Sequence, residues 1–228
     1  MASFLDLVNE RVVVYDGATG TFLQTLELSA DDFGGAELEG CNEYLAITRP
    51  DVVAKFHETY FDVGVDVVET DTFGGLPVTL GEYGLAERAH EINVAAARIA
   101  REVADGFSPP DRPRFEGGVD LFIIETMFDL LSIKAAMNGA RRAMAAAGRE
   151  VPLQVQVTME LTGRMLPGTE IGAALAALDP MHPDVIGLNC ATGPSEMGEH
   201  LRHLSQHARM PISCLPNAGL PSVVDGQM

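Results

Sequence analysis

Three reactive side chains lie at the ends of short apolar runs of the sequence. Cys190 follows DVIGLN and precedes ATGP, Glu125 ends a wholly apolar run, and Asp16 opens the glycine-rich stretch DGATGT. A thiol can hold a metal ion, and a carboxylate after an apolar run needs a partner because burying an unpaired charge is costly. A substrate ammonium group or a nearby arginine would be such a partner for Glu125. These residue types predict a polar site that contains a thiol and carboxylates.

Each of these positions also has a structural interpretation. A lone cysteine after a strand packs as a small apolar side chain, and Asp16 suits an Asx turn that supports the glycine-rich stretch. The other two cysteines are Cys41, in a loop after an acidic stretch, and Cys214, which comes shortly before a proline. We predict that both of these cysteines pack rather than bind metal.

The elements that must position these residues alternate along the chain. Nearly continuous apolar runs predict β-strands at 11–15, 65–69, 119–125, 153–158, 184–189 and 211–215. Continuous apolar runs are typical of parallel strands that are buried on both faces. Polar and glycine-rich residues follow five of the runs, and they include Asp16, Glu125 and Cys190.

Apolar residues at helical spacing predict amphipathic helices between the strands. The four stripes are Val52, Val53, Phe56, Tyr60 and Val63; Ile92, Ala96, Ile99 and Val103; Leu130, Ile133, Met137, Ala140 and Met144; and Met197, Leu201, Leu204 and Ala208. Core packing explains their methionines better than an adaptable binding face does. His200, His203 and His207 flank the last stripe, and we interpret them as a solvated helix face rather than a metal site.

Strands that alternate with helices predict a parallel α/β fold. No GxGxxG or GxxxxGK[ST] motif opens a helix, which disfavours a nucleotide-binding doubly wound sheet. Polar residues at the ends of several strands instead favour a (β/α)8 barrel, whose active site is built at that face.

Composition excludes several classes of partner. The net charge of −18 disfavours nucleic acids and anionic membrane surfaces, which both need clustered Lys and Arg. No run approaches the roughly 18 apolar residues that span a membrane, and the N-terminus does not read as a secretory signal. Three scattered cysteines are too few for a disulfide framework. We therefore expect a reduced, cytoplasmic protein.

The sequence resembles the homocysteine-binding (homocysteine S-methyltransferase) module of cobalamin-dependent methionine synthase. The resemblance covers roughly residues 10–221. Its motifs, in order, are DGATGTFLQ at 16–24, GCNEYLAITRPDVVAKFHETYFDVGVDVVETDTFGG at 40–75, IIETMFDLLSIKAA at 123–136, TMELTGRMLPGTE at 158–170, IGLNCATGP at 186–194 and PNAGLP at 216–221. The CNEYL and TRPD block favours this branch over shorter relatives that use S-methylmethionine or betaine.

The resemblance implies a (β/α)8 TIM-type barrel that transfers a methyl group to the sulfur of homocysteine and so produces methionine. Three cysteine thiolates of the family hold a zinc ion, which keeps the substrate thiol in its nucleophilic thiolate form. Methylcobalamin on a separate module is the implied methyl donor. The implied partners are homocysteine and the cobalamin- and folate-binding modules of a longer protein.

Site residues carry over motif by motif. Cys190 matches the first zinc cysteine, and Glu125 matches the carboxylate that receives the amino group of homocysteine. Asn217 matches an asparagine that can approach the zinc when substrate is absent. The remaining residues that the resemblance implies for the amino-acid end of the substrate are Asp16, Ala18, Thr19, Gly20 and Thr126.

The chain also departs from the family pattern. The other two zinc cysteines of the family are an adjacent pair in a Gly-Gly-Cys-Cys-Gly segment, and this chain contains no Cys-Cys. RPRF at 112–115 runs directly into EGGVD at 116–120, where the family has about one further βα unit. We therefore expect residues 1–228 to form a single domain that is shortened near residue 115 and truncated at the C-terminus, without strands three and eight.

Two other functions stay open at this point. The chain could be a non-catalytic fragment or degenerate paralogue of the family that binds an amino acid weakly. A different barrel enzyme, such as an aldolase, is disfavoured because Lys55 and Lys134 fall on predicted helices and no lysine follows a strand.

Overall fold

The computed structural model describes residues 3–109, 113–117 and 120–218. The chain divides into two compact units, Met1–Asp120 and Leu121–Met228. We call them the N-terminal unit and the C-terminal unit and describe each by itself. Among the described residues, no helix is long and apolar enough to cross a membrane.

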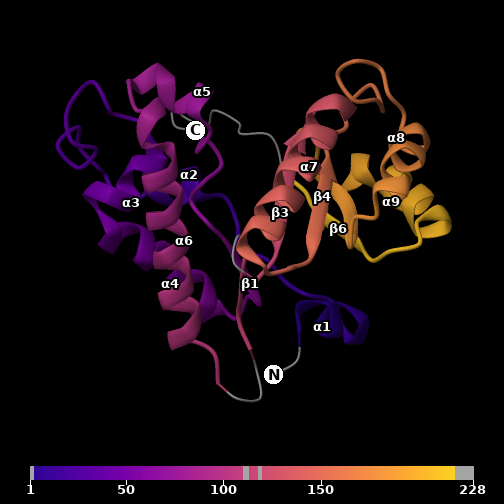
Figure 1. Ribbon diagram of the computed structural model, residues 1–228, viewed down its shortest axis with the longest axis horizontal. Helices are drawn as coiled ribbons and strands as arrows, with labels where there is room; N and C mark the ends of the chain where they lie inside the picture. The colour runs from indigo at the N-terminus through magenta and orange to yellow at the C-terminus, as the bar shows by residue number, and fades with distance from the viewer. Residues whose placement is uncertain (1–2, 110–112, 118–119, 219–228) are drawn as a thin grey trace. The chain divides into compact units, whose positions relative to one another are not determined.

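The N-terminal unit is mainly helical (Figure 1). Its elements, in chain order, are α1 Phe4–Glu10, α2 Thr19–Gln24, η1 Asn42–Tyr44, α3 Leu45–Thr48, α4 Pro50–Val63, β1 Val67–Glu69, α5 Pro77–Leu80, η2 Gly81–Tyr83, η3 Ala86–Arg88, α6 Ala89–Gly106 and β2 Phe115–Gly117. Helices α4 and α6 confirm the first two predicted helices.

Local sequence explains where α4 begins and ends. Pro50 occupies the first turn, where its missing N–H costs nothing, and Gly64 ends the helix in a left-handed conformation with φ 103°. On α6, alanines recur at four-residue spacing, and Ala96, Ala100 and Ala104 are all buried. Small side chains on this stripe allow α6 to pack closely against α4.

The small sheet of the N-terminal unit differs from the prediction. Strands β1 and β2 are parallel, with Val67 opposite Phe115. The predicted strand at 11–15 is wrong: the segment forms only an isolated bridge, between Tyr15 and Val67. Val12 and Val14 are exposed there, so their apolar character does not mark a strand buried on both faces. Strand β2 was not predicted because three residues, Phe-Glu-Gly, form no recognisable apolar run.

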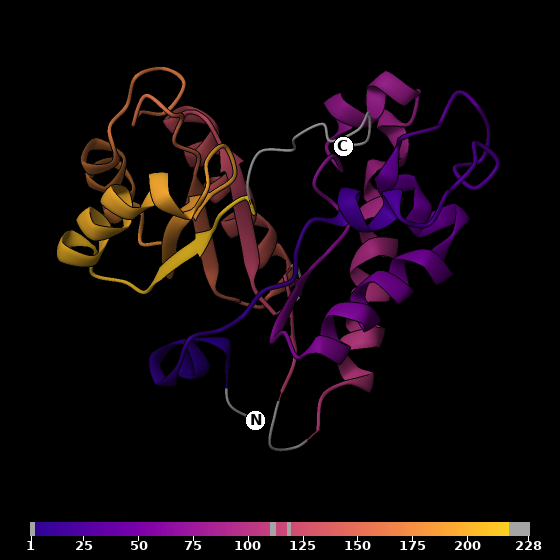
Figure 2. The same cartoon turned by 180° about the vertical axis from the view of Figure 1, so that it is seen from behind.

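The C-terminal unit contains one parallel sheet of four strands in the order β3-β4-β5-β6. Its elements are β3 Phe122–Met127, α7 Leu130–Ala147, β4 Leu153–Val157, α8 Ile171–Leu178, η4 Asp179–Met181, β5 Val185–Asn189, α9 Pro194–His207 and β6 Ile212–Leu215. Figures 1 and 2 show the three helices of this unit beside its sheet. Helices α7 and α9 confirm the last two predicted helices.

The two faces of this sheet have different chemistry. Leu153, Val155 and Val157 of β4 belong to the apolar core that the helices cover. Gln154 and Gln156 alternate with them along the strand and are also fully buried. Since successive side chains of a strand point to opposite faces, β4 contributes buried polar side chains to the second face of the sheet.

The structure confirms a parallel α/β fold. The four predicted strands of the C-terminal unit are present, and their ends either coincide with the prediction or are shifted by up to three residues. The predicted start of the strand at 119 and the end of the PNAGLP motif at 219–221 lie outside the described residues. The described strands form two separate sheets, so the closed barrel, the single domain and the absence of strands three and eight stay predictions.

Candidate functional site

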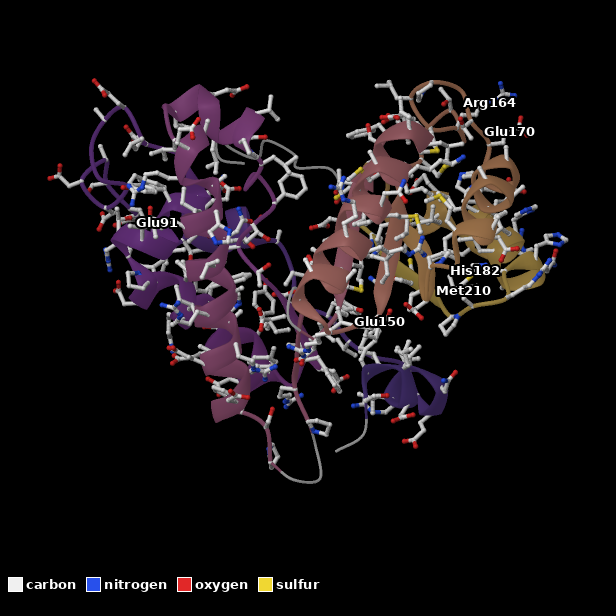
Figure 3. The ribbon with its side chains drawn as sticks, in the orientation of Figure 1. Glu91, Glu150, Arg164, Glu170, His182 and Met210 are labelled. Carbon is white, nitrogen blue, oxygen red and sulfur yellow. The ribbon has the colours of Figure 1, made fainter. Side chains whose placement is uncertain are left out.

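The amino and carboxyl ends of the sheet in the C-terminal unit can be told apart by the residues that lie near each end. Glu150, His182 and Met210 come shortly before β4, β5 and β6 and lie at one end of the unit (Figure 3). Arg164 and Glu170, which form an ion pair of 2.8 Å in the loop after β4, lie at the opposite end. Glu125 and Thr126 are near the end of β3 and Cys190 directly follows β5, so these candidate site residues lie at the carboxyl end of the sheet.

A β-bulge at the end of β3 brings two neighbouring side chains together. Ile124 is opposite Val155 and Met127 is opposite Val157, so β3 has one extra residue between these pairs. Thr126, within the bulge, has φ 52°. A regular strand would point Glu125 and Thr126 to opposite faces, but the bulge lets both hydrogen-bond to one residue of β5.

That residue is Asn189, the last residue of β5, with 2% of its surface exposed. Its Nδ2 donates to Glu125 Oε2 at 2.9 Å and to Thr126 Oγ1 at 2.8 Å. Its Oδ1 accepts from the Thr126 backbone N–H at 2.8 Å. Asn189 therefore uses both ends of its carboxamide to hold the bulge of β3.

Cys190 turns toward the same group of residues. The chain leaves β5 with Cys190 at φ 57° and Ala191 at φ 56°, a left-handed conformation that is unusual for residues other than glycine. The Thr126 hydroxyl lies 3.5 Å from Cys190 Sγ, and Asn189 Nδ2 lies 3.6 Å from it. Strained backbone that concentrates at one place is typical of functional sites.

The electrostatics of Glu125 follow from its surroundings. Burial raises the pKa of the Glu125 carboxyl above its ordinary value, and the hydrogen bond from Asn189 lowers it in part. Asn189 is the hydrogen-bond partner of this carboxyl among the described residues, and it uses only Oε2. A cationic group that reached Oε1 would stabilise the charged form of Glu125.

The loop after Cys190 also involves Asn217. The Thr192 N–H donates to the Cys190 carbonyl at 2.6 Å, and the Asn217 N–H donates to the Thr192 carbonyl at 3.2 Å. The Thr192 hydroxyl is buried and has no hydrogen-bond partner among the described residues. The structure thus places Glu125, Thr126, Cys190 and Asn217 in one region of the C-terminal unit.

The predicted glycine-rich stretch lies in the N-terminal unit. Asp16 accepts hydrogen bonds from the Glu69 N–H at 3.2 and 3.1 Å, which ties the stretch to the end of β1. Ala18 is the N-cap of α2, and Thr19 and Gly20 are its first residues. Because the units are described separately, the role of these residues in substrate binding stays a prediction.

The surroundings of the three cysteines can be compared within the part of the chain that the structure describes. Within the described residues, no group of three or more His, Cys, Asp and Glu side chains could hold a metal ion. Cys41 is buried in an apolar cluster of the N-terminal unit, which confirms the packing prediction. Cys214 is exposed on β6, so packing was the wrong prediction for it, although its Sγ lies 3.9 Å from Met197 Sδ.

Sequence reasoning gave no role to Asn189. It noted this residue only as part of the polar motif that follows β5. An amide side chain at the end of the apolar run DVIGL was the available signal, because a buried amide needs partners. The identity of those partners depends on the bulge in β3, which leaves no mark in the sequence.

Comparison with known proteins adds a family. The sequence profile named Homocysteine S-methyltransferase matches residues 13–115 and 112–228, which together cover most of the chain. Methionine synthases of Mycobacterium tuberculosis (strain ATCC 25618 / H37Rv) and Mycobacterium leprae (strain TN) are each 48% identical to it over 251 residues. These matches cover 95% of this chain and 21% of each relative, so the chain spans about a fifth of their length.

Solved structures show a similar fold. The metallated form of the homocysteine methyltransferase MmuM from Escherichia coli superposes with a TM-score of 0.77, covering 93% of this chain and 86% of that one. Its oxidized form gives a TM-score of 0.75 over 93% and 85%. The sequence identity is 16% in both cases, so this likeness concerns the fold alone.

Proposed function

The chain belongs to the homocysteine S-methyltransferase family, and we propose that it is the homocysteine-binding module of a methionine synthase. The observation that carries this proposal is the network at the ends of β3 and β5, which joins the Glu125 carboxylate to the Cys190 thiol through Asn189 and the Thr126 hydroxyl. One group suits the ammonium of an amino acid, and the other lies where a substrate sulfur would be held.

In this proposal, Glu125 binds the ammonium group of homocysteine. Its Oε2 is taken by Asn189, and its Oε1 makes no hydrogen bond with a described residue. Glu125 is half-buried, and a charge-assisted hydrogen bond in such a setting contributes about 1.5–3 kcal/mol. In the proposed reaction the bond between the methyl group and its donor would break as the S–C bond of methionine forms, the donor would leave with the electron pair of the broken bond, and the thiol proton of homocysteine would pass to solvent.

Zinc is the cofactor that the resemblance implies, but the described residues do not fit a closed zinc site. A structural or catalytic zinc site takes three or four protein ligands, and Cys190 is a single thiol. The described residues add no cluster of metal-binding side chains around it. When bound in a complete site, zinc would keep the substrate sulfur as a thiolate. Methylcobalamin and the modules that carry cobalamin and folate belong to the same proposal for a longer, cytoplasmic protein.

We also propose that the family domain is a closed (β/α)8 barrel and that this chain lacks one βα unit of it near residue 115. The two profile matches meet at residues 112–115, which supports a break there. The match to the mycobacterial relatives runs over 251 aligned positions. The aligned part of this chain is 95% of 228 residues, so it cannot fill all of these positions. Relatives thus carry residues that have no counterpart in this chain.

Substrate analogues test the assigned role of Glu125. L-homocysteine and 4-mercaptobutyrate share a thiol and a carboxylate and differ only in the amino group. Isothermal titration calorimetry should show that the chain prefers L-homocysteine. In Glu125→Gln, the affinity for L-homocysteine should fall about 10- to 150-fold, because one charged hydrogen bond is lost, while 4-mercaptobutyrate binds as before.

A matched control separates the site from a general charge effect. Glu150→Gln removes the same charge from an exposed residue before β4, at the other end of the unit (Figure 3). It should bind both ligands like the unsubstituted chain. Equal affinity of the unsubstituted chain for the two ligands would show that Glu125 does not bind the ammonium group.

The single thiol favours a second candidate function. A chain that has Cys190 without neighbouring metal ligands could bind the amino-acid end of homocysteine and transfer no methyl group. Methyl transfer from free methylcobalamin to homocysteine, measured with added zinc, distinguishes the two candidates. Methionine formation supports the enzyme, and binding without methionine formation supports the non-catalytic form.

A further inference from the structure

The orientation of the Asn189 carboxamide is fixed by the backbone of β3. A backbone N–H can only donate, so the Asn189 atom that faces the Thr126 N–H at 2.8 Å must be the oxygen. The Nδ2 amine must then face the Glu125 carboxylate and the Thr126 hydroxyl, at 2.9 and 2.8 Å. The direction of these hydrogen bonds follows from covalent chemistry alone.

Counting protons gives the direction of the next hydrogen bond. The Nδ2 amine has two hydrogens, and its two nearer acceptors are the Glu125 and Thr126 oxygens. Since Thr126 Oγ1 accepts one of these hydrogens, its own proton is available to Cys190 Sγ at 3.5 Å. Hydrogen bonds therefore run from the amide to the hydroxyl and from the hydroxyl to the sulfur.

We propose that Asn189 and Thr126 are positioning residues of the homocysteine site. The Thr126 N–H fixes the orientation of the Asn189 carboxamide. Its Nδ2 then holds the Glu125 carboxylate directly and, through the Thr126 hydroxyl, holds the Cys190 sulfur in a defined position. Neither positioning residue touches the reacting atoms. The inference rests on the proposed function, because it takes Glu125 and Cys190 as the groups that receive the two ends of the substrate.

The local backbone supports a role beyond folding. Thr126 at φ 52° and Cys190 at φ 57° are in the left-handed region, which is strained for residues other than glycine. Both residues face the same carboxamide, which is almost fully buried. Strain that is retained on both sides of a buried amide indicates that the arrangement of acceptors is itself required.

Asn189→Asp is the direct test, because it changes one NH2 group to an oxygen and keeps the shape of the side chain. The new oxygen would face Glu125 Oε2, so two acceptors would meet there, and the Thr126 hydroxyl would turn to donate to the new oxygen instead of to Cys190 Sγ. Calorimetry should show L-homocysteine affinity reduced at least tenfold and the preference over 4-mercaptobutyrate lost. Asn138→Asp, on the exposed side of α7, adds the same charge and should change neither.

A substrate-independent measurement tests the network itself. Side-chain amide signals of Asn189, identified in 15N NMR spectra by their loss in Asn189→Asp, should shift in Glu125→Gln and also in Thr126→Val. Valine keeps the branched shape at this strained position and removes only the hydroxyl, and Thr126→Ser should restore the signals. The NMR measurement tests the network even if Asn189→Asp binds L-homocysteine too weakly for calorimetry.

The outcomes separate the two proposals. Asn189→Asp that keeps the wild-type preference, or Asn189 signals that ignore both Thr126→Val and Glu125→Gln, would overturn the positioning role. A wild-type chain without any preference between the two ligands would instead overturn the proposed role of Glu125. Coupled amide signals together with a lost preference in Asn189→Asp support the inference.

Discussion

Asp71 is a buried carboxyl group whose neighbourhood opposes its charge. It lies two residues after β1 and is 5% exposed. Burial and the nearby Glu43 carboxylate raise the pKa of Asp71 to about 7. A carboxyl whose pKa is higher in the folded chain than in the unfolded one stabilises the fold when it is protonated. That stabilisation is complete below the unfolded pKa, near 4, and is lost as pH rises through about 7.

Asp71→Asn is neutral at every pH and should remove this dependence. At pH 8.5 the variant should be more stable than the unsubstituted chain by about 2–4 kcal/mol, and the two should converge near pH 4. Urea unfolding followed across this pH range measures the difference. Asp62→Asn, on the exposed side of α4, is the control and should give a flat difference. A difference in the free energy of unfolding between Asp71→Asn and the unsubstituted chain that stays constant with pH would contradict the prediction.

Gly187, at the centre of β5, lies so close to β6 that its backbone leaves no room for a Cβ atom. A Cβ atom there would lie 2.3 Å from the Ser213 carbonyl oxygen and 2.8 Å from Gln156 Oε1. Gln156 Nε2 also donates to Ser213 Oγ at 3.1 Å across the same face. The missing side chain of Gly187 thus makes room for the polar contacts on this face of the sheet.

Gly187→Ala should therefore destabilise the C-terminal unit by about 1–3 kcal/mol, because the backbone of β6 would have to move. Gly139→Ala provides the opposite case. Gly139 lies inside α7, where a Cβ meets nothing within 4 Å, so alanine should stabilise the helix by about 0.5–1 kcal/mol. Thermal unfolding of the two variants should show shifts of opposite sign. A stabilising Gly187→Ala would mean that β5 and β6 are not packed as described.

The same elements show what the sequence could predict. The sequence predicts helices α4, α6, α7 and α9 from the spacing of their apolar residues, because apolar residues at every third or fourth position share one face only in a helix. The segment at 11–15 has a strand-like composition but pairs at Tyr15 alone, and composition carries no information on partners. The bulge at Thr126 depends on the register between β3 and β4, which is a property of two strands and not of either sequence.

Glu125 and Cys190 were predicted from their residue types, and the structure brings them together through Asn189 and the Thr126 hydroxyl. Residue type predicts what a side chain can do, and strand ends predict roughly where it lies. The hydrogen bonds between such side chains depend on backbone turns of a few residues, such as the left-handed pair Cys190 and Ala191. That is why the positioning role of Asn189 emerged only from the structure.

At the scale of the whole molecule, the family profile matches most of the chain, whereas the described residues contain no group of three or more side chains that could hold a metal ion. It aligns with 21% of each mycobacterial methionine synthase, and in the proposed function Cys190 is the one described cysteine expected to bind zinc. The acidic balance, with a net charge of −18, can attract cations in general but does not create a selective zinc site. Zinc selectivity comes from several thiolate or imidazole ligands at about 2.0–2.3 Å.

Zinc content therefore tests whether this chain is complete as a metalloprotein. We predict that the purified 228-residue chain retains much less than one zinc ion after dialysis against a chelator, because one thiolate binds zinc far more weakly than three. Atomic emission spectroscopy measures the ratio directly, and Cys190→Ala should remove whatever zinc remains. Stoichiometric zinc that survives chelation would contradict the prediction and show that other side chains of the chain have been recruited. Cys41→Ala and Cys214→Ala would then identify them, since each lost ligand should lower the retained zinc.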